Sequence, residues 1–107
     1  MKSLMELNID NLEICSIKGI NASFDMLSED DIKEYIDTMH EIGCEYGTIK
    51  NIILSNPLSL NKTRDEILEV VNKLISWGIR DMDMFLDTNP RVFNVYNLTS
   101  DYLNTIY

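Results

Sequence analysis

Five acidic residues recur along segment 29–45 with the spacing of one helix face. Successive members are four, three, four and four positions apart, so a helix would carry all five on the side opposite its apolar residues. Such a surface could dock on a basic protein or imitate a nucleic-acid backbone; the alternative is a solvated face that only keeps the protein soluble. The candidate partner-binding residues are Asp30, Glu34, Asp37, Glu41 and Glu45.

Basic side chains from position 50 onward form a second candidate surface. If the fold brought them to one edge, they could hold a few phosphates of a nucleic acid. The alternative is that these dispersed bases are ordinary surface residues among local acids. The candidate nucleic-acid-binding residues are Lys50, Lys62, Arg64 and Arg91.

The spacing of a catalytic or metal site is not found among the histidine and cysteines. His40, the only histidine, lacks a third catalytic member, so we expect a structural pair with Asp37 or Glu41. Cys15 and Cys44 have no second cysteine or histidine at ligand spacing, and we expect both to pack as small core residues. We therefore predict a protein that is not an enzyme and binds no metal or cofactor.

Asp81, Asp83 and Asp87 form a second acidic group. Calcium needs several oxygens from a turning loop, commonly with a glycine at the bend, whereas these residues fall in a short predicted helix. We expect Asp81 and Asp83 to favour the start of that helix through its dipole rather than to hold a metal.

Length and charge narrow the class of protein. With 107 residues, 45% of them hydrophobic, the chain fits a single domain with one core. Its 18 acids and nine bases give a formal net charge of −9, which argues against bulk phosphate binding and against an anionic membrane surface. No apolar run approaches the roughly 18 residues of a spanning helix. Acids in the first 20 residues argue against a secretory leader, so we expect a soluble, cytoplasmic protein.

A period of about 35 residues organises the elements that must position these side chains. Three segments begin with a hydroxyl residue that can cap a helix, followed two positions later by aspartate. They start at Ser28, Thr63 and Thr99, which are 35 and 36 positions apart. Residue types that end helices, asparagine and glycine, recur at the same period. They are Asn8, Gly43 and Gly78.

Each repeat unit is expected to contain two helices and a short 3₁₀ segment. Apolar residues at helical spacing predict the first helix, with Trp77 in the core of the second unit. The second helix is expected at about 46–55 and about 81–88. It ends before Pro57 and Pro90, because residues that precede proline avoid the helical conformation. We predict an all-α single domain with half-units 1–27 and 99–107 and full units 28–62 and 63–98.

Both terminal half-units carry apolar residues whose partners the sequence does not identify. Terminal repeats normally present a polar outer face. Self-association through these ends and capping by the neighbouring unit both remain open. The apolar residues are Leu4, Leu7, Leu12, Ile14 and Ile17 at one end, and Tyr96, Leu98, Tyr102, Leu103, Ile106 and Tyr107 at the other.

The residues shared by the two full units form a motif. The second unit carries Leu74-Ile75-Ser76-Trp77-Gly78-Ile79, Met82, Phe85-Leu86 and Asn89-Pro90-Arg91-Val92-Phe93. The first unit matches it with Met39, Ile42-Gly43, Ile49, Ile52-Ile53, Asn56-Pro57, Leu58 and Leu60. This motif resembles the repeat of the mitochondrial transcription termination factor family. The resemblance implies a superhelix of helix–helix–3₁₀ units that grips nucleic acid along a basic concave face. The family usually has several more units, a basic groove and an organelle-targeting leader, none of which we expect for this chain.

Two functions of different classes follow from these features. The first is a small acidic protein-binding module without catalysis, such as an inhibitor or nucleic-acid mimic, which docks on a basic partner through the 29–45 face. The second is a nucleic-acid-binding helical repeat protein, which a continuous positive groove would favour. Neither function calls for association with a membrane.

Overall fold

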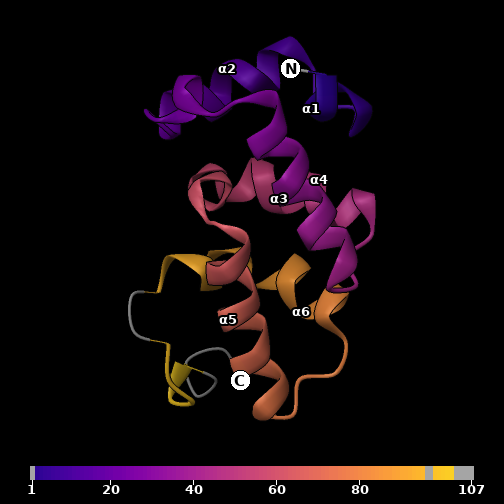
Figure 1. Cartoon of the computed structure of the whole chain (residues 1–107), viewed down its shortest axis with the longest axis vertical. Coiled ribbons are helices and arrows are strands. Elements are labelled where there is room, and N and C mark those ends of the chain that lie inside the picture. Colours follow the sequence, from indigo (N-terminus) through magenta and orange to yellow (C-terminus); the bar gives the residue numbers. More distant parts are fainter. Residues whose placement is uncertain (1, 96–97, 103–107) are drawn as a thin grey trace.

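Residues 2–95 and 98–102 are described by the structure, a computed structural model of the 107-residue chain (Figure 1). Over these residues every regular element is helical, which confirms the expected all-α fold. The predicted half-unit 99–107 lies mostly outside the described residues, as do Tyr96, Leu103, Ile106 and Tyr107. The elements are α1 (Lys2–Glu6), α2 (Asn11–Ile20), η1 (Phe24–Met26), α3 (Glu29–Glu41), α4 (Tyr46–Ser55), η2 (Pro57–Asn61), α5 (Arg64–Ser76), α6 (Met82–Thr88) and η3 (Pro90–Asn94), where η marks a 3₁₀ helix.

Capping boxes start three of the α-helices. Ser28 begins α3 and Thr63 begins α5; each side chain accepts a hydrogen bond from the amide three residues on, and that residue's carboxylate accepts one in return. The sequence predicts both hydroxyl residues as helix caps. Asp10 makes the same reciprocal pair with Glu13 at the start of α2, where no box was predicted. Aspartate serves as well as serine because its oxygen reaches the same orphan amide.

Left-handed residues follow the ends of α1, α3 and α5. The φ angles are +62° at Asn8, +110° at Gly43 and +95° at Gly78. In each case the next residue's amide donates back to a carbonyl of the helix, at 3.0–3.1 Å. The same turn therefore occurs three times, 35 residues apart, and each time it reverses the chain into the next helix.

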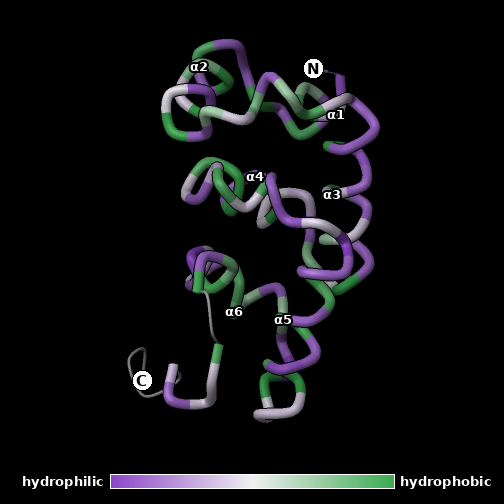
Figure 2. Tube along the Cα trace, turned by 60° about the vertical axis from the view of Figure 1, so that its left-hand side comes forward, coloured by the Kyte–Doolittle hydropathy of each residue, from purple (hydrophilic) through white to green (hydrophobic). Residues whose placement is uncertain are grey.

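The helices form two columns that run the length of the molecule. Figure 1 shows α1 and α2 at one end, α3 and α4 in the middle, and α5 and α6 at the other end. In Figure 2, α2, α4 and α6 lie one below another on one side, and α1, α3 and α5 on the other. The packed pairs include α1 with α3, α3 with α5, α2 with α4 and α4 with α6. The molecule measures 37 × 23 × 22 Å. The division into repeat units remains a prediction.

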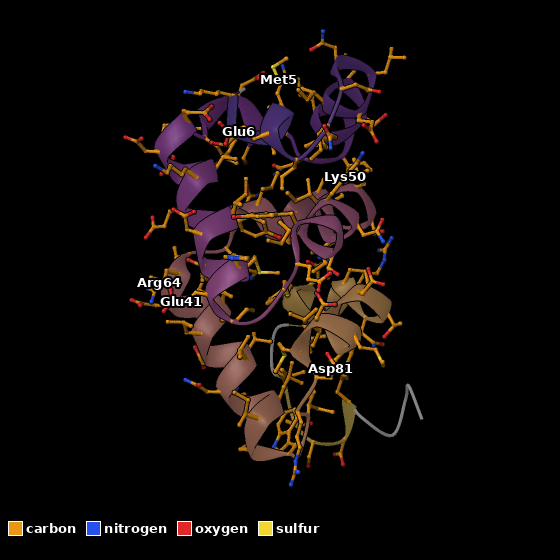
Figure 3. The ribbon with its side chains drawn as sticks, turned by 90° about the vertical axis from the view of Figure 1, so that its right-hand side faces the viewer. Met5, Glu6, Glu41, Lys50, Arg64 and Asp81 are labelled. Carbon is orange, nitrogen blue, oxygen red and sulfur yellow. The ribbon has the colours of Figure 1, made fainter. Side chains whose placement is uncertain are left out.

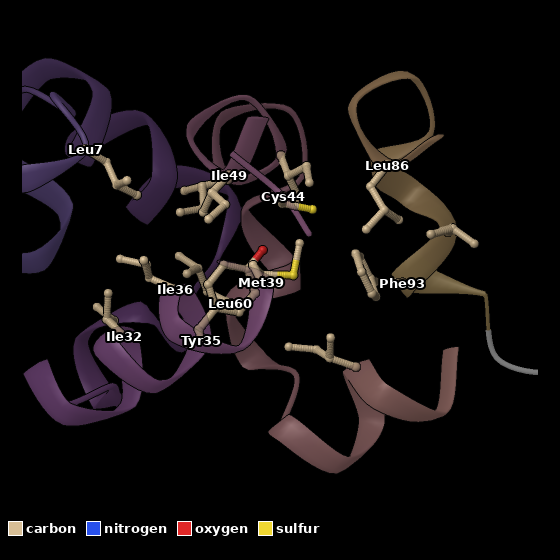
Figure 4. Close-up of a cluster of buried hydrophobic side chains, with 14 of the residues drawn as sticks. Leu7, Ile32, Tyr35, Ile36, Met39, Cys44, Ile49, Leu60, Leu86 and Phe93 are labelled. Carbon is tan, nitrogen blue, oxygen red and sulfur yellow. The ribbon is translucent and has the colours of Figure 1, made fainter. Parts of the chain in front are cut away.

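One continuous core lies between the columns and reaches from α1 to η3 (Figure 4). Met39, Ile49 and Leu74 are fully buried, and a side chain of this size contributes roughly 1.5–3 kcal/mol when it leaves water. Trp77, expected in the core, is only partly buried, because it lies one residue beyond the end of α5. Phe24, in the short 3₁₀ helix η1, is buried as well.

Two buried asparagines connect the ends of α2 and α4 to the 3₁₀ helix that follows the next helix of the same column. The Nδ2 of Asn21, just after α2, donates to the carbonyl of Pro57 at 3.1 Å. The Nδ2 of Asn56, just after α4, donates to the carbonyl of Pro90 at 2.8 Å. Each amide also donates, at 3.1 Å, to an asparagine side chain at the end of the same 3₁₀ helix. These second acceptors are Asn61 and Asn94.

Candidate functional site

Helix α3 presents acids to solvent and apolar residues to the core, as the sequence predicts. Its buried stripe contains Ile32, Tyr35, Ile36 and Met39. The opposite side is exposed, and successive members of the acidic set fall within one arc because steps of three and four residues return to the same helix face. Four of the five predicted partner-binding residues lie on this face. They are Asp30, Glu34, Asp37 and Glu41.

Glu45, the fifth predicted residue, does not belong to this helix face. Helix α3 ends at Glu41, and the left-handed Gly43 turns the chain away before Glu45 is reached. Glu45 is the residue that precedes α4, and its amide donates to Asp83 Oδ1 at 2.8 Å. The expectation that all five acids share one helix is therefore wrong at this position.

Glu41 is paired within the fold. Arg64 of α5 donates to both of its carboxylate oxygens, at 2.6 and 2.9 Å, in a bidentate ion pair (Figure 3). The pair lowers the pKa of Glu41 and raises the pKa of Arg64 through the hydrogen bonds and the opposite charges. One residue from the acidic candidate set thus neutralises one from the basic candidate set.

Two acids at the start of α3 also serve the fold. Glu29 accepts a hydrogen bond from the amide of Ser3 in α1, and the contacts with Ser3 lower the pKa of Glu29. Asp31 accepts from the amide of Ser28 at 2.9 Å in the capping box, which lowers the pKa of Asp31. These carboxylates hold the helix in place, so they are separate from the exposed acidic face.

The remaining acids of α3 have no such role. Asp30, Glu34 and Asp37 are exposed and form no ion pair with any described residue. We call these three the free carboxylates of α3. They form the part of the predicted docking surface that the fold itself leaves unused.

Two hollows border the free carboxylates, one on each side of α3. Glu34 lines the first hollow, whose apolar walls include Tyr35 and Leu60. Asp37 lines the second, together with Ile36 of α3 and with residues from α1 and α4. The apolar residues of the second hollow, Leu7, Ile36 and Tyr46, were not predicted as site residues. No sequence signal identifies them, because three separate helices bring them together.

The basic candidates do not form one surface. Lys50 donates to the carbonyl of Asn8 at 2.8 Å, and Lys62 lies 3.9 Å from a carboxylate oxygen of Glu66. Arg64 is held by the ion pair described above. Figure 3 shows Lys50 and Arg64 at opposite edges of the molecule. Arg91 lies on η3, exposed, without an ion-pair partner among the described residues.

His40 and Cys15 take other environments than expected, whereas Cys44 lies in the core as predicted. The His40 ring stacks on Tyr46 with centroids 4.7 Å apart, and its Nδ1 lies 3.2 Å from the carbonyl of Cys44. The predicted pair of His40 with Asp37 or Glu41 is therefore wrong. Cys44 is buried, which raises the pKa of its thiol to about 12. Cys15 is exposed, so its predicted place in the core is wrong.

The second acidic group connects α6 to the rest of the fold. Asp81 accepts a hydrogen bond from the amide of Met84 and caps α6, in keeping with the helix-start role predicted for it. Asp83 accepts from the amide of Glu45, and Asp87 accepts from Asn51 Nδ2 at 3.0 Å. No group of three or more potential metal ligands occurs among the described residues.

Comparison with known proteins gives this chain no relative. It matches no family model, no curated protein and no solved structure. Within the described residues, the longest and most apolar helices still fall short of what is needed to cross a membrane.

Proposed function

We propose that this chain is a non-catalytic protein-binding module that docks on a basic partner through α3. The free carboxylates Asp30, Glu34 and Asp37 make the central contacts. One observation carries the proposal: these three acids share an exposed helix face and have no ion-pair partner among the described residues. The proposal keeps the cytoplasmic location expected from the sequence.

The charge of the whole chain supports a basic partner. A net charge of −9 attracts cationic surfaces over long distances and raises the rate of encounter. Acids four residues apart on one helix repel each other and weaken it slightly, as at Asp30 and Glu34. A partner's lysine or arginine would relieve that repulsion, so binding and helix stability would increase together.

The two hollows beside α3 add apolar contact to this surface. Interfaces owe most of their affinity to a few side chains that enter well-packed pockets, while charged residues at the rim set orientation and rate. Tyr35 and Leu60 line one hollow, and Leu7 and Ile36 line the other. The best-fitting partner therefore has basic residues flanked by apolar ones. A nucleic-acid-binding cleft occupied by an inhibitor is one surface of this kind.

Nucleic-acid binding, the second candidate function, has less support. Lys50, Lys62 and Arg64 already contact a carbonyl or a carboxylate of this chain. Binding phosphates would require breaking those contacts, and Lys50 lies at the opposite edge of the molecule from Arg64 (Figure 3). The family resemblance stays a hypothesis about the fold.

Two charge-reversed variants would test the proposal, since each changes the net charge by the same amount. The first reverses the free carboxylates of α3. Its substitutions are Asp30→Lys, Glu34→Lys and Asp37→Lys. The second, a matched control, reverses three exposed acids that lie elsewhere. Its substitutions are Asp25→Lys, Glu69→Lys and Asp101→Lys.

Each tagged protein is used to recover partners from a lysate of its own host, with protein and nucleic acid both identified. We expect the wild type and the control to retain the same basic protein at low salt and to release it at high salt. The α3 variant should lose that protein while its circular dichroism remains helical. Equal recovery by both variants would remove α3 as the docking surface. Nucleic acid that remains after bound proteins are removed would favour the second candidate function.

A further inference from the structure

In the column α2–α4–α6, a charged side chain of each following helix reaches back to the turn before the preceding one. Lys50 of α4 reaches back and donates to the carbonyl of Asn8, in the turn before α2. Asp83 of α6 reaches back and accepts from the amide of Glu45, in the turn before α4. Each turn is therefore covered by the second helix of the pair that follows it (Figure 2).

No described residue reaches back in this way to the third such turn, before α6. It borders an open hollow of about 550 Å³ that is lined by Gly78, Ile79, Asp81, Met84 and Phe85, among others. The Met84 side chain remains 64% exposed there. No described helix lies across this hollow, whereas α4 and α6 occupy the equivalent places beneath α2 and α4.

Asn89 shows the same missing contact. It follows α6 as Asn21 follows α2 and Asn56 follows α4. Those two asparagines donate across to the next 3₁₀ helix. Asn89 instead donates to the carbonyl of Phe85 and to Thr88 Oγ1, both at 3.0 Å, within its own helix end. The acceptor that would continue the series is absent from the described residues.

The opposite end of the column offers the complementary parts. Cys15 is the fifth residue of α2, as Lys50 is the fifth residue of α4, and Cys15 is exposed. Ala22 follows Asn21 as Pro57 follows Asn56, so its carbonyl holds the position of the Pro57 carbonyl that accepts an asparagine. One end thus has an uncovered turn, and the other has the kind of helix that covers such turns.

We propose that copies of this chain associate head to tail, with α2 of one copy lying in the hollow under α6 of the next. Cys15 of one copy then lies over segment 78–81 of its neighbour, and Asn89 donates to the carbonyl of Ala22. The contact joins two different surfaces, so it can extend into rings or filaments. It is small, and we expect weak, concentration-dependent association. The second copy is the occupant because α4 and α6 already show which helix fills this place.

Salt separates this proposal from docking on a basic partner. Every copy carries a net charge of −9, so copies repel one another and screening should strengthen self-association. Binding of a basic partner through α3 should instead weaken with salt. Self-association is thus independent of the proposed function, and either proposal can fail while the other stands.

The first test is the mass of the purified chain, measured by sedimentation over a range of protein and salt concentrations. We expect oligomers that increase with both. Met84→Lys should abolish them, whereas Ile75→Lys, an equally exposed apolar residue of α5 outside the hollow, should leave them unchanged. A monomer at every concentration would overturn the proposal. Oligomers that persist in Met84→Lys would overturn the assigned surface.

The second test is oxidative cross-linking of the native Cys15 to a cysteine placed beside the hollow. Arg80→Cys should form disulfide-linked oligomers, and these should disappear when Cys15→Ser is added. Glu69→Cys, on the exposed surface of α5, is the matched control and should give no ladder. Equal cross-linking of the two cysteine variants would mean random collision and would overturn the head-to-tail arrangement.

Discussion

The two junctions between helix pairs share the same asparagine side-chain hydrogen bond but differ in their charged contacts. The first junction joins α1 and α2 to α3 and α4; the second joins α3 and α4 to α5 and α6. A buried asparagine, Asn21 in the first and Asn56 in the second, donates to a proline carbonyl across each. The charged contact has the opposite sign at the two junctions. Lys50 donates to the turn before α2 at the first junction, and Asp83 accepts from the turn before α4 at the second.

The same reversal occurs on the α1–α3–α5 side. Glu29 accepts from α1 at the first junction, and Arg64, 35 residues later, pairs with α3 at the second. The buried asparagine hydrogen bond therefore sets how one helix pair packs on the next, while the exposed contacts can use either charge. Helix α3 takes part in both junctions through its ends, at Glu29 and Glu41. Only its middle and Asp30 are left with carboxylates free to meet a partner.

The largest effect on stability should come from removing the asparagine hydrogen bond that both junctions share. Asn56→Leu and Asn21→Leu each remove two donors and take one hydrogen bond from a proline carbonyl and one from an asparagine side chain, so we expect each to lower the free energy of unfolding by about 2–4 kcal/mol. Urea denaturation measures this. Asn72→Leu, on the exposed face of α5, should change stability by less than about 0.5 kcal/mol. A wild-type midpoint for either buried variant would show that its junction does not depend on the amide.

A smaller effect should come from the left-handed turns. Gly43→Ala and Gly78→Ala should each lose about 1–2 kcal/mol, because an L-residue is strained at these positive φ angles. A Cβ atom would meet no neighbour at either position, so the loss is conformational. Asn8→Gly should differ little from the wild type, since glycine adopts φ near +62° without strain. Thermal unfolding of the three variants compares the turns, and unchanged alanine variants would contradict these φ angles.

Smaller still is the effect of the charged contacts, which differ in how they respond to pH. Arg64 lowers the pKa of Glu41, so this contribution to stability is present above the ordinary carboxyl pKa and is lost as pH falls below about 4. The stability difference between the wild type and Arg64→Met should therefore shrink in acid. Lys50→Met removes a bond to a carbonyl that does not titrate, together with a longer contact, 3.9 Å, to the Glu13 carboxylate, so its difference should shrink less. Urea denaturation at several pH values measures both differences. Differences that fall by the same amount in acid would contradict this contrast.

The last prediction concerns reactivity and involves no change in stability. Cys44 lies at the second junction, where burial raises the pKa of its thiol to about 12, whereas Cys15 lies exposed on α2. Iodoacetamide at neutral pH should modify Cys15 and spare Cys44, because the thiolate is the reacting form. Peptide mass mapping reports both sites. Equal modification in the folded chain would mean that the second junction opens readily.

Local signals in the sequence were enough to predict helices α3 to α6. Hydroxyl caps at Ser28 and Thr63 start helices, and the turns at Gly43 and Gly78 end them, because capping involves residues only a few positions apart. The amide of Asn56 finds its acceptor 34 residues later, so the contact depends on how the helices pack. No local pattern encodes that distance.

For the candidate site too, the sequence predicts what lies within one helix and misses the contacts between helices. Periodicity places Asp30, Glu34 and Asp37 on one exposed face. It cannot show that Glu41 is paired, because Arg64 comes from another helix. The turn at Gly43 could have shown that Glu45 leaves the face, since a left-handed glycine ends the helix before it.

The most direct test of docking through α3 is an amide chemical-shift titration of the isotope-labelled chain with the basic protein that it recovers. We expect the largest shift changes at Asp30, Glu34 and Asp37 and along the two hollows, and their loss at high salt. Changes centred on Lys62 and Arg91, or on α6, would contradict docking through α3. Failure of the wild-type chain to recover any basic protein would contradict it as well.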